Sequence, residues 1–247
     1  MKLIGNTMLV TGGGSGIGQA LAWRFHDLGN TVIVAGRGVE RLGETIEGRA
    51  NMHALALDVG DNGSVAAAID VLKHDFPALN SAILSAGIMT WQELGRGGDI
   101  GTAEEVVNIN LLGTMRTAEA LIPLIAGKPN AAICTVSSGL GFVPLPAAPA
   151  YSASKAGVHS YTLSLRQRLK GQVEVIEIPP PAVRTRLTPG QETREGYMPL
   201  DAYIDETMAN FEREPEAQEN LVANVLPLRF AERNGTVAEM LDHLGSF

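Results

Sequence analysis

The sequence predicts an α/β fold in which a doubly wound parallel sheet of about six strands is covered by helices on both faces. Short runs of β-branched and apolar residues alternate with longer amphipathic stretches along most of the chain, and this pattern is typical of such sheets. The 247 residues, of which 45% are hydrophobic, fit a single domain over 1–247 better than two smaller ones.

The expected elements alternate strand and helix up to residue 178. Strands are predicted over 7–11, 31–35, 53–57, 79–84, 131–136 and 173–178, and helices over 16–28, 39–50, 64–76, 102–125 and 151–169. Residues 179–228 are expected to form a substrate loop and a helical C-terminal region within the same domain. Helices are predicted there over 208–219 and 221–228, and another over 237–244, but no seventh strand.

Composition excludes several classes of function. The net charge of −8 argues against a nucleic-acid or anionic-membrane partner. The single cysteine, Cys134, excludes an intramolecular disulfide and a multi-cysteine metal site; it lies in an apolar run, where we expect a buried small hydrophobe. No metal site is predicted. The start of the chain is too short and too polar for a signal peptide, and no apolar run reaches membrane-spanning length, so a cytoplasmic protein is expected.

A glycine-rich turn joins the first predicted strand to the first helix. It reads Thr11-Gly-Gly-Gly-Ser-Gly-Ile-Gly18. Glycines let the backbone approach a pyrophosphate closely, and the following helix N-terminus offers free N–H groups. The candidate contacts in this turn are Gly12, Gly14, Ser15, Gly16, Ile17 and Gly18. The alternative is a glycine-rich turn without a ligand.

The end of the second strand bears on the choice of nicotinamide cofactor. An acidic residue there would accept bonds from a ribose 2′-hydroxyl, but this chain has Gly36-Arg37. Arg37 can pair with a 2′-phosphate, which favours NADP(H) and leaves NAD(H) as the alternative; Arg37 could also be an ordinary exposed arginine. Asp58, after the third strand, could meet an adenine amino group or serve as a turn or N-cap residue.

Tyr151 and Lys155 lie four residues apart on a predicted helix, so they share one face. An ammonium beside a phenol favours the phenolate and lowers its pKa. Lowering that pKa by about 3 units needs roughly 4 kcal/mol, which one lysine and a cationic cofactor could supply. The alternative is a buried tyrosine beside a lysine whose stem lies along it.

Together these motifs resemble those of the short-chain dehydrogenase/reductase family, whose fold is the Rossmann type. The resemblance spans about 7–187 and includes the glycine turn, Asp58-Val59, Ser85-Ala-Gly87, Asn110-Leu-Leu-Gly113, Ser138, Tyr151-x-x-x-Lys155 and Pro180-x-x-Val183-x-Thr185. The sequence around 177–200 is similar to the DltE-like branch, named for D-alanine esterification of teichoic acid.

The resemblance implies a role for each matching residue. Tyr151 would be the general acid or base, Ser138 would hold the substrate oxygen, and Lys155 would bind the nicotinamide ribose and lower the Tyr151 pKa. Asn110 would position a water that relays protons to Lys155; its alternative is a backbone-bonding or helix-kink asparagine. Ser137 competes with Ser138, but the spacing to the tyrosine favours Ser138. Further cofactor contacts would come from Val59, Ala86, Gly87, Val183 and Thr185.

Three departures from the family pattern stand out. Ser85 replaces the usual asparagine, Pro181 replaces a glycine, and the usual final strand is missing, so the sheet ends in a helical extension. In the family that strand helps to build a tetramer, so a tetramer is in doubt and a homodimer is expected.

The expected substrate is a small ketone or secondary alcohol with an apolar or aromatic group. Candidate lining segments are 89–94, 140–149 and 187–197, with Met89 and Leu140 as the named contacts, and the middle segment is almost wholly apolar. That segment could instead pack against the core or a dimer partner. Residues 188–194 could form a lid. Two other functions remain: a non-catalytic NADP(H)-binding regulator or scaffold, and a sugar-nucleotide epimerase, which the short chain disfavours.

Overall fold

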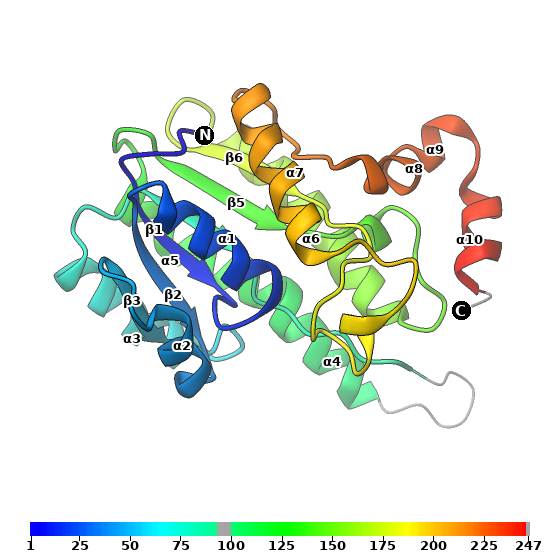
Figure 1. The fold of residues 1–247 in the computed structure, drawn as a ribbon, viewed down its shortest axis with the longest axis horizontal. Coiled ribbons are helices and arrows are strands. Elements are labelled where there is room, and N and C mark those ends of the chain that lie inside the picture. Colours follow the sequence, from blue (N-terminus) through cyan, green and yellow to red (C-terminus); the bar gives the residue numbers. More distant parts are fainter. Residues whose placement is uncertain (93–99, 246–247) are drawn as a thin grey trace.

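The computed structural model describes residues 1–92 and 100–245. Six parallel strands form one sheet in the order β3-β2-β1-β4-β5-β6 (Figure 1). The strands are β1 Thr7–Thr11, β2 Thr31–Gly36, β3 Met52–Ala56, β4 Ser81–Leu84, β5 Ala132–Val136 and β6 Glu174–Ile178. This order reverses direction between β1 and β4, where doubly wound folds bind their ligands. The predicted fold class is therefore confirmed.

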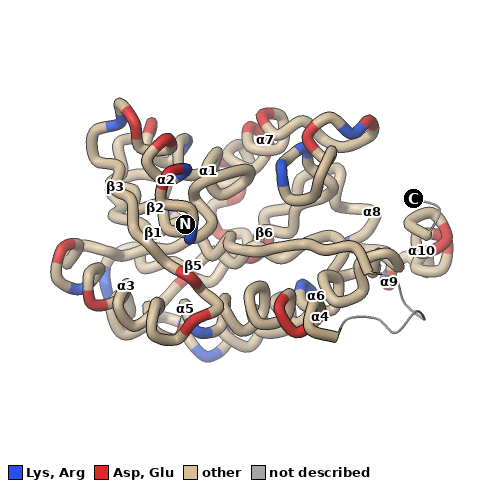
Figure 2. Tube along the Cα trace, turned by 90° about the horizontal axis from the view of Figure 1, so that it is seen from below, with Lys and Arg blue, Asp and Glu red and all other residues tan. Residues whose placement is uncertain are grey.

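Helices cover both faces of the sheet (Figure 2). On one side lie α1 (Gly16–Asp27), α2 (Val39–Ile46) and α7 (Leu200–Arg213), which share a core with the strands. On the other side lie α3 (Asn62–Asp75), α5 (Gly113–Ile125) and α6 (Pro149–Arg168), which form a second core. Strands β1, β2, β4 and β5 are buried on both faces, which explains their apolar runs, whereas the edge strand β3 exposes His53, Ala54 and Ala56.

The long helix predicted over 102–125 has an interruption in its middle. It consists of α4 (Ile100–Val107), a π-helical turn η1 (Asn108–Leu112) and α5. A π turn carries one extra residue and often marks a functional position. Here it contains Asn110, which is fully buried.

Two predicted helices have wrong boundaries. The helix predicted over 39–50 ends at Ile46, and Gly48 follows in the left-handed region at φ +70°. The helix predicted over 208–219 is α7, which begins after Pro199 and ends at Arg213. Pro215 cannot continue a helix, and the segment after it instead runs beside β6.

The C-terminal region is helical, as predicted, but in shorter pieces. It contains η4 (Ala223–Val225), α8 (Leu226–Arg229), α9 (Ala231–Asn234) and α10 (Val237–Gly245). These lie at the end of the molecule opposite α3 (Figure 1). Shorter 3-10 turns are η2 (Gly139–Gly141) and η3 (Gln191–Thr193). Among the described helices, none has the length and apolarity that crossing a bilayer requires.

Candidate active site

A cavity of about 370 Å³ opens at the carboxyl ends of the strands, next to the β1–β4 switch point. It is lined by every residue predicted to touch the cofactor and by three of the four predicted catalytic residues. These are Gly12, Gly14, Ser15, Gly16, Ile17, Gly18, Arg37, Asp58, Val59, Ala86, Gly87, Val183 and Thr185, together with Ser138, Tyr151 and Lys155. The structure thus brings the predicted residues together around one opening, although the first and last of them, Gly12 and Thr185, are 173 positions apart in the sequence.

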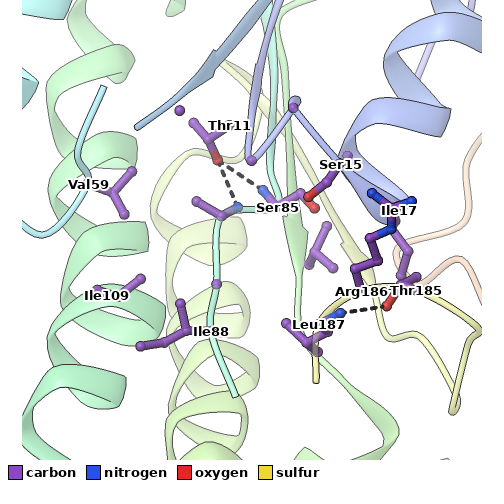
Figure 3. Close-up of a pocket in the computed structure, with 18 of the residues that line it drawn as sticks. Thr11, Ser15, Ile17, Val59, Ser85, Ile88, Ile109, Thr185, Arg186 and Leu187 are labelled. Carbon is purple, nitrogen blue, oxygen red and sulfur yellow. Dashed lines mark hydrogen bonds between the residues drawn. The ribbon is translucent and has the colours of Figure 1, made fainter. Parts of the chain in front are cut away.

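The glycine turn is held tightly against the end of β4. Thr11 Oγ1 accepts hydrogen bonds from the main-chain N–H groups of Ser85 (3.0 Å) and Ala86 (3.1 Å) (Figure 3). Gly12 has φ +68°, and a Cβ on Gly18 would lie 2.5 Å from the Gly12 carbonyl oxygen. Only glycine fits there. Ser15 makes no capping bond to α1, so N–H groups of its first turn remain available to an anion.

The charges around the cavity favour an anionic ligand. Four cationic side chains line it, Arg37, Arg41, Lys155 and Arg186, against one carboxylate, Asp58. In a chain of net charge −8 this local excess is distinctive. Figure 3 shows Arg186 reaching along the wall beside Ile17 and Thr185, close to the glycine turn. Asp58 Oδ1 accepts from the Gly60 N–H at 2.9 Å, so its alternative role in a turn is present.

Tyr151 and Ser138 lie together in the deep part of this site, at 7% and 6% exposure. Burial raises the pKa of Tyr151 to about 12, and its hydrogen bond with Ser138 only partly offsets this. In the chain without a cofactor, desolvation outweighs the contact with Ser138, and Lys155 is not among the causes of the shift. The expected lowering, which also relied on a cationic cofactor, stays a prediction for the bound state. At neutral pH Tyr151 carries its proton.

Lys155 lies one turn further along α6, with its ammonium buried. Its Nζ donates to the Val136 carbonyl at 2.8 Å and lies 5.8 Å from the Tyr151 ring centroid. Burial lowers the Lys155 pKa to about 8. Lys155 thus contacts the end of β5 rather than the phenol oxygen directly.

The two neighbouring serines differ in their surroundings. Ser137 Oγ donates to the buried Glu177 carboxylate at 2.5 Å, so its hydroxyl proton is already engaged, although Ser137 also lines the cavity. Ser138 Oγ accepts from the Leu140 N–H at 3.1 Å and interacts with Tyr151. The spacing argument for Ser138 over Ser137 is consistent with this geometry.

Asn110 lies beside the site without lining the cavity. Its Oδ1 accepts from the Ile88 N–H (2.8 Å), and its Nδ2 donates to the Ile88 carbonyl (2.9 Å) and to Ser154 Oγ (3.1 Å). The structure therefore shows the backbone-bonding alternative for its side chain. This side chain fixes the segment after β4 against the π turn.

The predicted substrate segments meet around Tyr151. Met89, Leu140 and Leu187 pack against one apolar cluster that contains Tyr151 and Leu145. Leu187 also lines the cavity, while Met89 and Leu140 lie behind it in this cluster. Glu93 and Leu94, at the end of the first segment, lie outside the described residues. Leu244 of α10 joins the same cluster, so the C-terminal helix reaches the substrate side.

The predicted lid over 188–194 is anchored by a buried glutamine. Gln191 Nε2 donates to the Val183 carbonyl (2.8 Å) and to Thr185 Oγ1 (3.2 Å), and its Oε1 accepts from Thr188 (2.8 Å). Gln191 also lines the cavity. The loop that carries Val183 and Thr185 is thereby folded onto itself.

Sequence reasoning did not single out two of the cavity arginines, Arg41 and Arg186. Arg41 could have been found, because it lies four residues after Arg37, in the first part of α2. Arg186 had no local signal, since only the folding of the loop after β6 brings it to the cavity, whereas Gln191 lies within the predicted lining segment 187–197. Cys134 is buried as predicted, and burial raises its pKa to about 12, which makes the thiol a poor nucleophile.

The fold and the site define a nucleotide-binding α/β protein with a buried tyrosine–lysine pair. The sequence profile described as short chain dehydrogenase matches residues 6–196. The chain belongs to this family.

Two relatives are similar over most of the chain. The uncharacterized oxidoreductase DltE of Bacillus subtilis is 36% identical over 198 residues, which cover 79% of either chain. Sulfoacetaldehyde reductase 2 of Chromohalobacter salexigens is 33% identical over 186 residues, covering 73% of this chain and 74% of that one. The resemblance to the DltE-like branch is thus confirmed.

Solved structures support the fold. A short-chain dehydrogenase from Burkholderia cenocepacia in complex with NADP superposes with a TM-score of 0.84 at 24% identity, covering 98% of this chain and 99% of that one. One from Burkholderia phymatum in complex with NAD has a TM-score of 0.83 at 20% identity and covers 96% of both.

Proposed function

We propose that the protein is an NADP(H)-dependent oxidoreductase that transfers a hydride between the nicotinamide and a ketone or secondary alcohol. The observation that carries this proposal is the shared cavity. Ser138, Tyr151 and Lys155 lie at one part of it, and the glycine turn and three arginines line the rest. A bound nicotinamide cofactor would supply the hydride. The chain itself has to bind the cofactor, orient the substrate and exchange a proton with the substrate oxygen.

Each residue of the chain has a task that follows from its environment. Tyr151 is protonated at neutral pH because burial raises its pKa to about 12, so it carries the proton that carbonyl reduction requires. A bound cationic cofactor would bring this pKa closer to the working pH, where a general acid is most effective. Ser138 presents its hydroxyl next to Tyr151, where it can hold the same substrate oxygen. Lys155 is charged below about pH 8, and its positive charge attracts anionic groups in this part of the cavity. Asn110 keeps the wall after β4 in place.

The preference for NADP(H) rests on two arginines near the end of β2. Arg37 directly follows β2 and Arg41 lies in α2; both line the cavity, and guanidinium groups bind phosphate oxygens in a bidentate manner. NAD(H) is the alternative cofactor. Asp58 is the only acid among the described lining residues, and one oxygen of its carboxylate already bonds Gly60.

The substrate class follows from the apolar cluster around Tyr151. Met89, Leu140, Leu145 and Leu187 share an apolar cluster with Tyr151, and Leu187 also lines the cavity, which favours a carbonyl compound with an apolar or aromatic group. The name of the sulfoacetaldehyde reductase relative also denotes carbonyl reduction. Its sulfonate substrate differs from the apolar class that this cluster favours.

We further propose a homodimer through α4, α5 and α6. Ile100 on α4, Leu112 at the end of the π turn η1 and Leu163 on α6 are exposed. Large apolar side chains gathered on neighbouring helices favour a protein interface.

The decisive experiment replaces Tyr151 by Phe and measures turnover of a panel of ketones with NADPH. We expect a loss of about 10²-fold or more in kcat with NADPH affinity retained. Full activity of Tyr151→Phe would exclude the mechanism. Tight NADPH binding by the wild type without turnover of any carbonyl or alcohol would favour the alternative, a non-catalytic NADP(H)-binding regulator.

A further inference from the structure

Glu177 is a fully buried carboxylate in the middle of β6, between apolar neighbours. Its Oε1 accepts from Ser137 Oγ at 2.5 Å, and its Oε2 lies 2.7 Å from His159 Nδ1. Burying a carboxylate is costly unless its oxygens are satisfied. Both oxygens have a partner here, so the geometry around Glu177 is closely defined.

The two partners of Glu177 belong to the elements that carry the active site. Ser137 immediately precedes Ser138 at the end of β5. His159 lies on α6, and Tyr151, Lys155 and His159 follow one another at intervals of four residues, which places them along one face. One carboxylate therefore joins the Ser138 loop to the Tyr151–Lys155 helix from behind.

The C-terminal segment closes this arrangement on its outer side. Arg229 donates two hydrogen bonds to Glu219, at 2.7 and 2.9 Å, and its guanidinium lies 4.8 Å from the Phe142 ring centroid. Phe142 in turn packs edge-on to His159, with ring centroids 4.8 Å apart. These contacts place aromatic and ion-paired groups next to the Glu177–His159 interaction.

This cluster does not suit the two reactive functions that its residue types suggest. Ligand atoms of His159, Glu177 and Glu219 lie within 4.8 Å of one another, but the Arg229 guanidinium already pairs with Glu219 where a metal ion would need it. A Ser–His–acid relay needs the histidine in the middle, whereas here Glu177 stands between Ser137 and His159.

We infer that Glu177 is a positioning residue, which fixes Ser138 relative to Tyr151 and Lys155 by bridging Ser137 and His159. The inference rests on the proposed function. A hydroxyl that must meet the same substrate oxygen as a phenol tolerates little displacement, and a shift of about 1 Å costs up to 10²-fold in rate. The bridge spans the loop and the helix whose separation sets that geometry.

The test compares kcat, cofactor affinity and thermal stability in four variants. Glu177→Leu and Ser137→Ala are each expected to lower kcat about tenfold to a hundredfold, with NADPH affinity unchanged. Glu177→Gln should recover most of the activity that Glu177→Leu loses, because an amide can accept from Ser137 and donate to His159. The Glu177→Leu/Ser137→Ala double variant should be no worse than Glu177→Leu, since both break one bridge.

Thr162→Val is the matched control. Thr162 on α6 and Thr135 on β5 share a buried hydrogen bond of 2.7 Å. It joins the helix of His159 to the strand that precedes Ser137. This variant should lower the Tm and change kcat by less than about twofold. An equal loss of kcat in Thr162→Val and Ser137→Ala would overturn the inference, as would variants of Ser137 and Glu177 that lose only stability.

Failure of the Glu177 role can be distinguished from misfolding and from failure of the proposed function. If Glu177→Leu does not fold, Ser137→Ala and Glu177→Gln still decide the matter through the kcat they retain. If Tyr151→Phe is inactive while Ser137→Ala and Glu177→Leu have wild-type kcat, only the role of Glu177 fails. If Tyr151→Phe keeps full activity, the proposed function itself fails.

Discussion

Gly141 lies directly against the main chain of Lys155. A Cβ placed on Gly141 would be 2.9 Å from the Lys155 carbonyl carbon and 3.0 Å from the Ala156 nitrogen. The 3-10 turn after Ser138 is thus in backbone contact with the helix that carries Tyr151 and Lys155. Since both sides of this contact are main chain, neither can move aside by a rotamer change.

Gly141→Ala is therefore expected to separate the Ser138 turn from α6. We predict a loss of stability of about 1–3 kcal/mol from overpacking and a fall in kcat, measured by urea unfolding and steady-state kinetics. Gly139→Ala is the matched control. Its Cβ would meet the end of the Leu228 side chain at 2.8 Å, which can rotate away, so a smaller effect is expected. Equal effects at the two glycines would contradict this explanation.

The cavity arginines should separate into two groups by cofactor binding. Arg37→Ala and Arg41→Ala are predicted to weaken NADPH binding by about tenfold or more, because each removes a charge-assisted hydrogen bond, and to leave NADH binding almost unchanged. Arg186→Gln should weaken both equally, because Arg186 lies by the glycine turn, where the common diphosphate would bind. Calorimetric titration of both cofactors checks this. Selective loss of NADPH binding in Arg186→Gln would reverse the assignment.

The buried lysine should leave a mark on stability at alkaline pH. Lys155 has a pKa of about 8 in the fold and an ordinary value of 10.5, so between these pH values the unfolded chain binds more protons. The free energy of unfolding then rises with pH, by at most about 1.4 kcal/mol per unit. Tyr151, with a pKa of about 12, acts in the opposite direction only above pH 10.

The measurement is urea unfolding of wild type and Lys155→Met between pH 7 and 10. Above pH 8 the unfolding free energy of the wild type should rise relative to that of Lys155→Met, because the cost of burying the ammonium is relieved as it loses its proton. Parallel curves for the two proteins would show that the Lys155 pKa is not lowered in the fold.

The proposed dimer predicts a specific response to charge. Leu163→Glu or Leu112→Glu should shift the protein towards monomer, because a carboxylate would be buried in an apolar interface. Leu163 is 46% exposed and Leu112 is 40% exposed. Val39→Glu is the control. Val39 is exposed on α2, away from the proposed interface, so this variant should keep the oligomeric state of the wild type. Analytical ultracentrifugation distinguishes these outcomes, and a monomeric wild type would refute the dimer.

The sheet could be predicted because most of its strands, namely β1, β2, β4 and β5, are buried on both faces and read as short apolar runs. The glycine turn and the residues around Ser138, Tyr151 and Lys155 were also accessible, since their spacing is local. Helix boundaries were harder. The helix predicted over 208–219 runs past Arg213, whereas α7 ends there, just before Pro215.

The remaining site residues depend on tertiary contacts. Arg186 and Gln191 reach the cavity only because the loop after β6 folds back on itself. The raised pKa of Tyr151 could not be read from its spacing to Lys155, because it comes from burial. Glu177 did leave a signal, as a charged residue between Ile176 and Ile178, but its partners come from two other elements.

The outer edge of β6 has a consequence for how copies of this chain can assemble. The Glu177 N–H donates to the Gln218 carbonyl, the Asn220 N–H donates to the Glu177 carbonyl, and Arg166 caps the Val175 carbonyl. These main-chain groups would otherwise be open to strand pairing. The chain thus covers the β6 edge of its sheet with an irregular segment, so a second sheet cannot pair with β6 without first displacing residues 218–220.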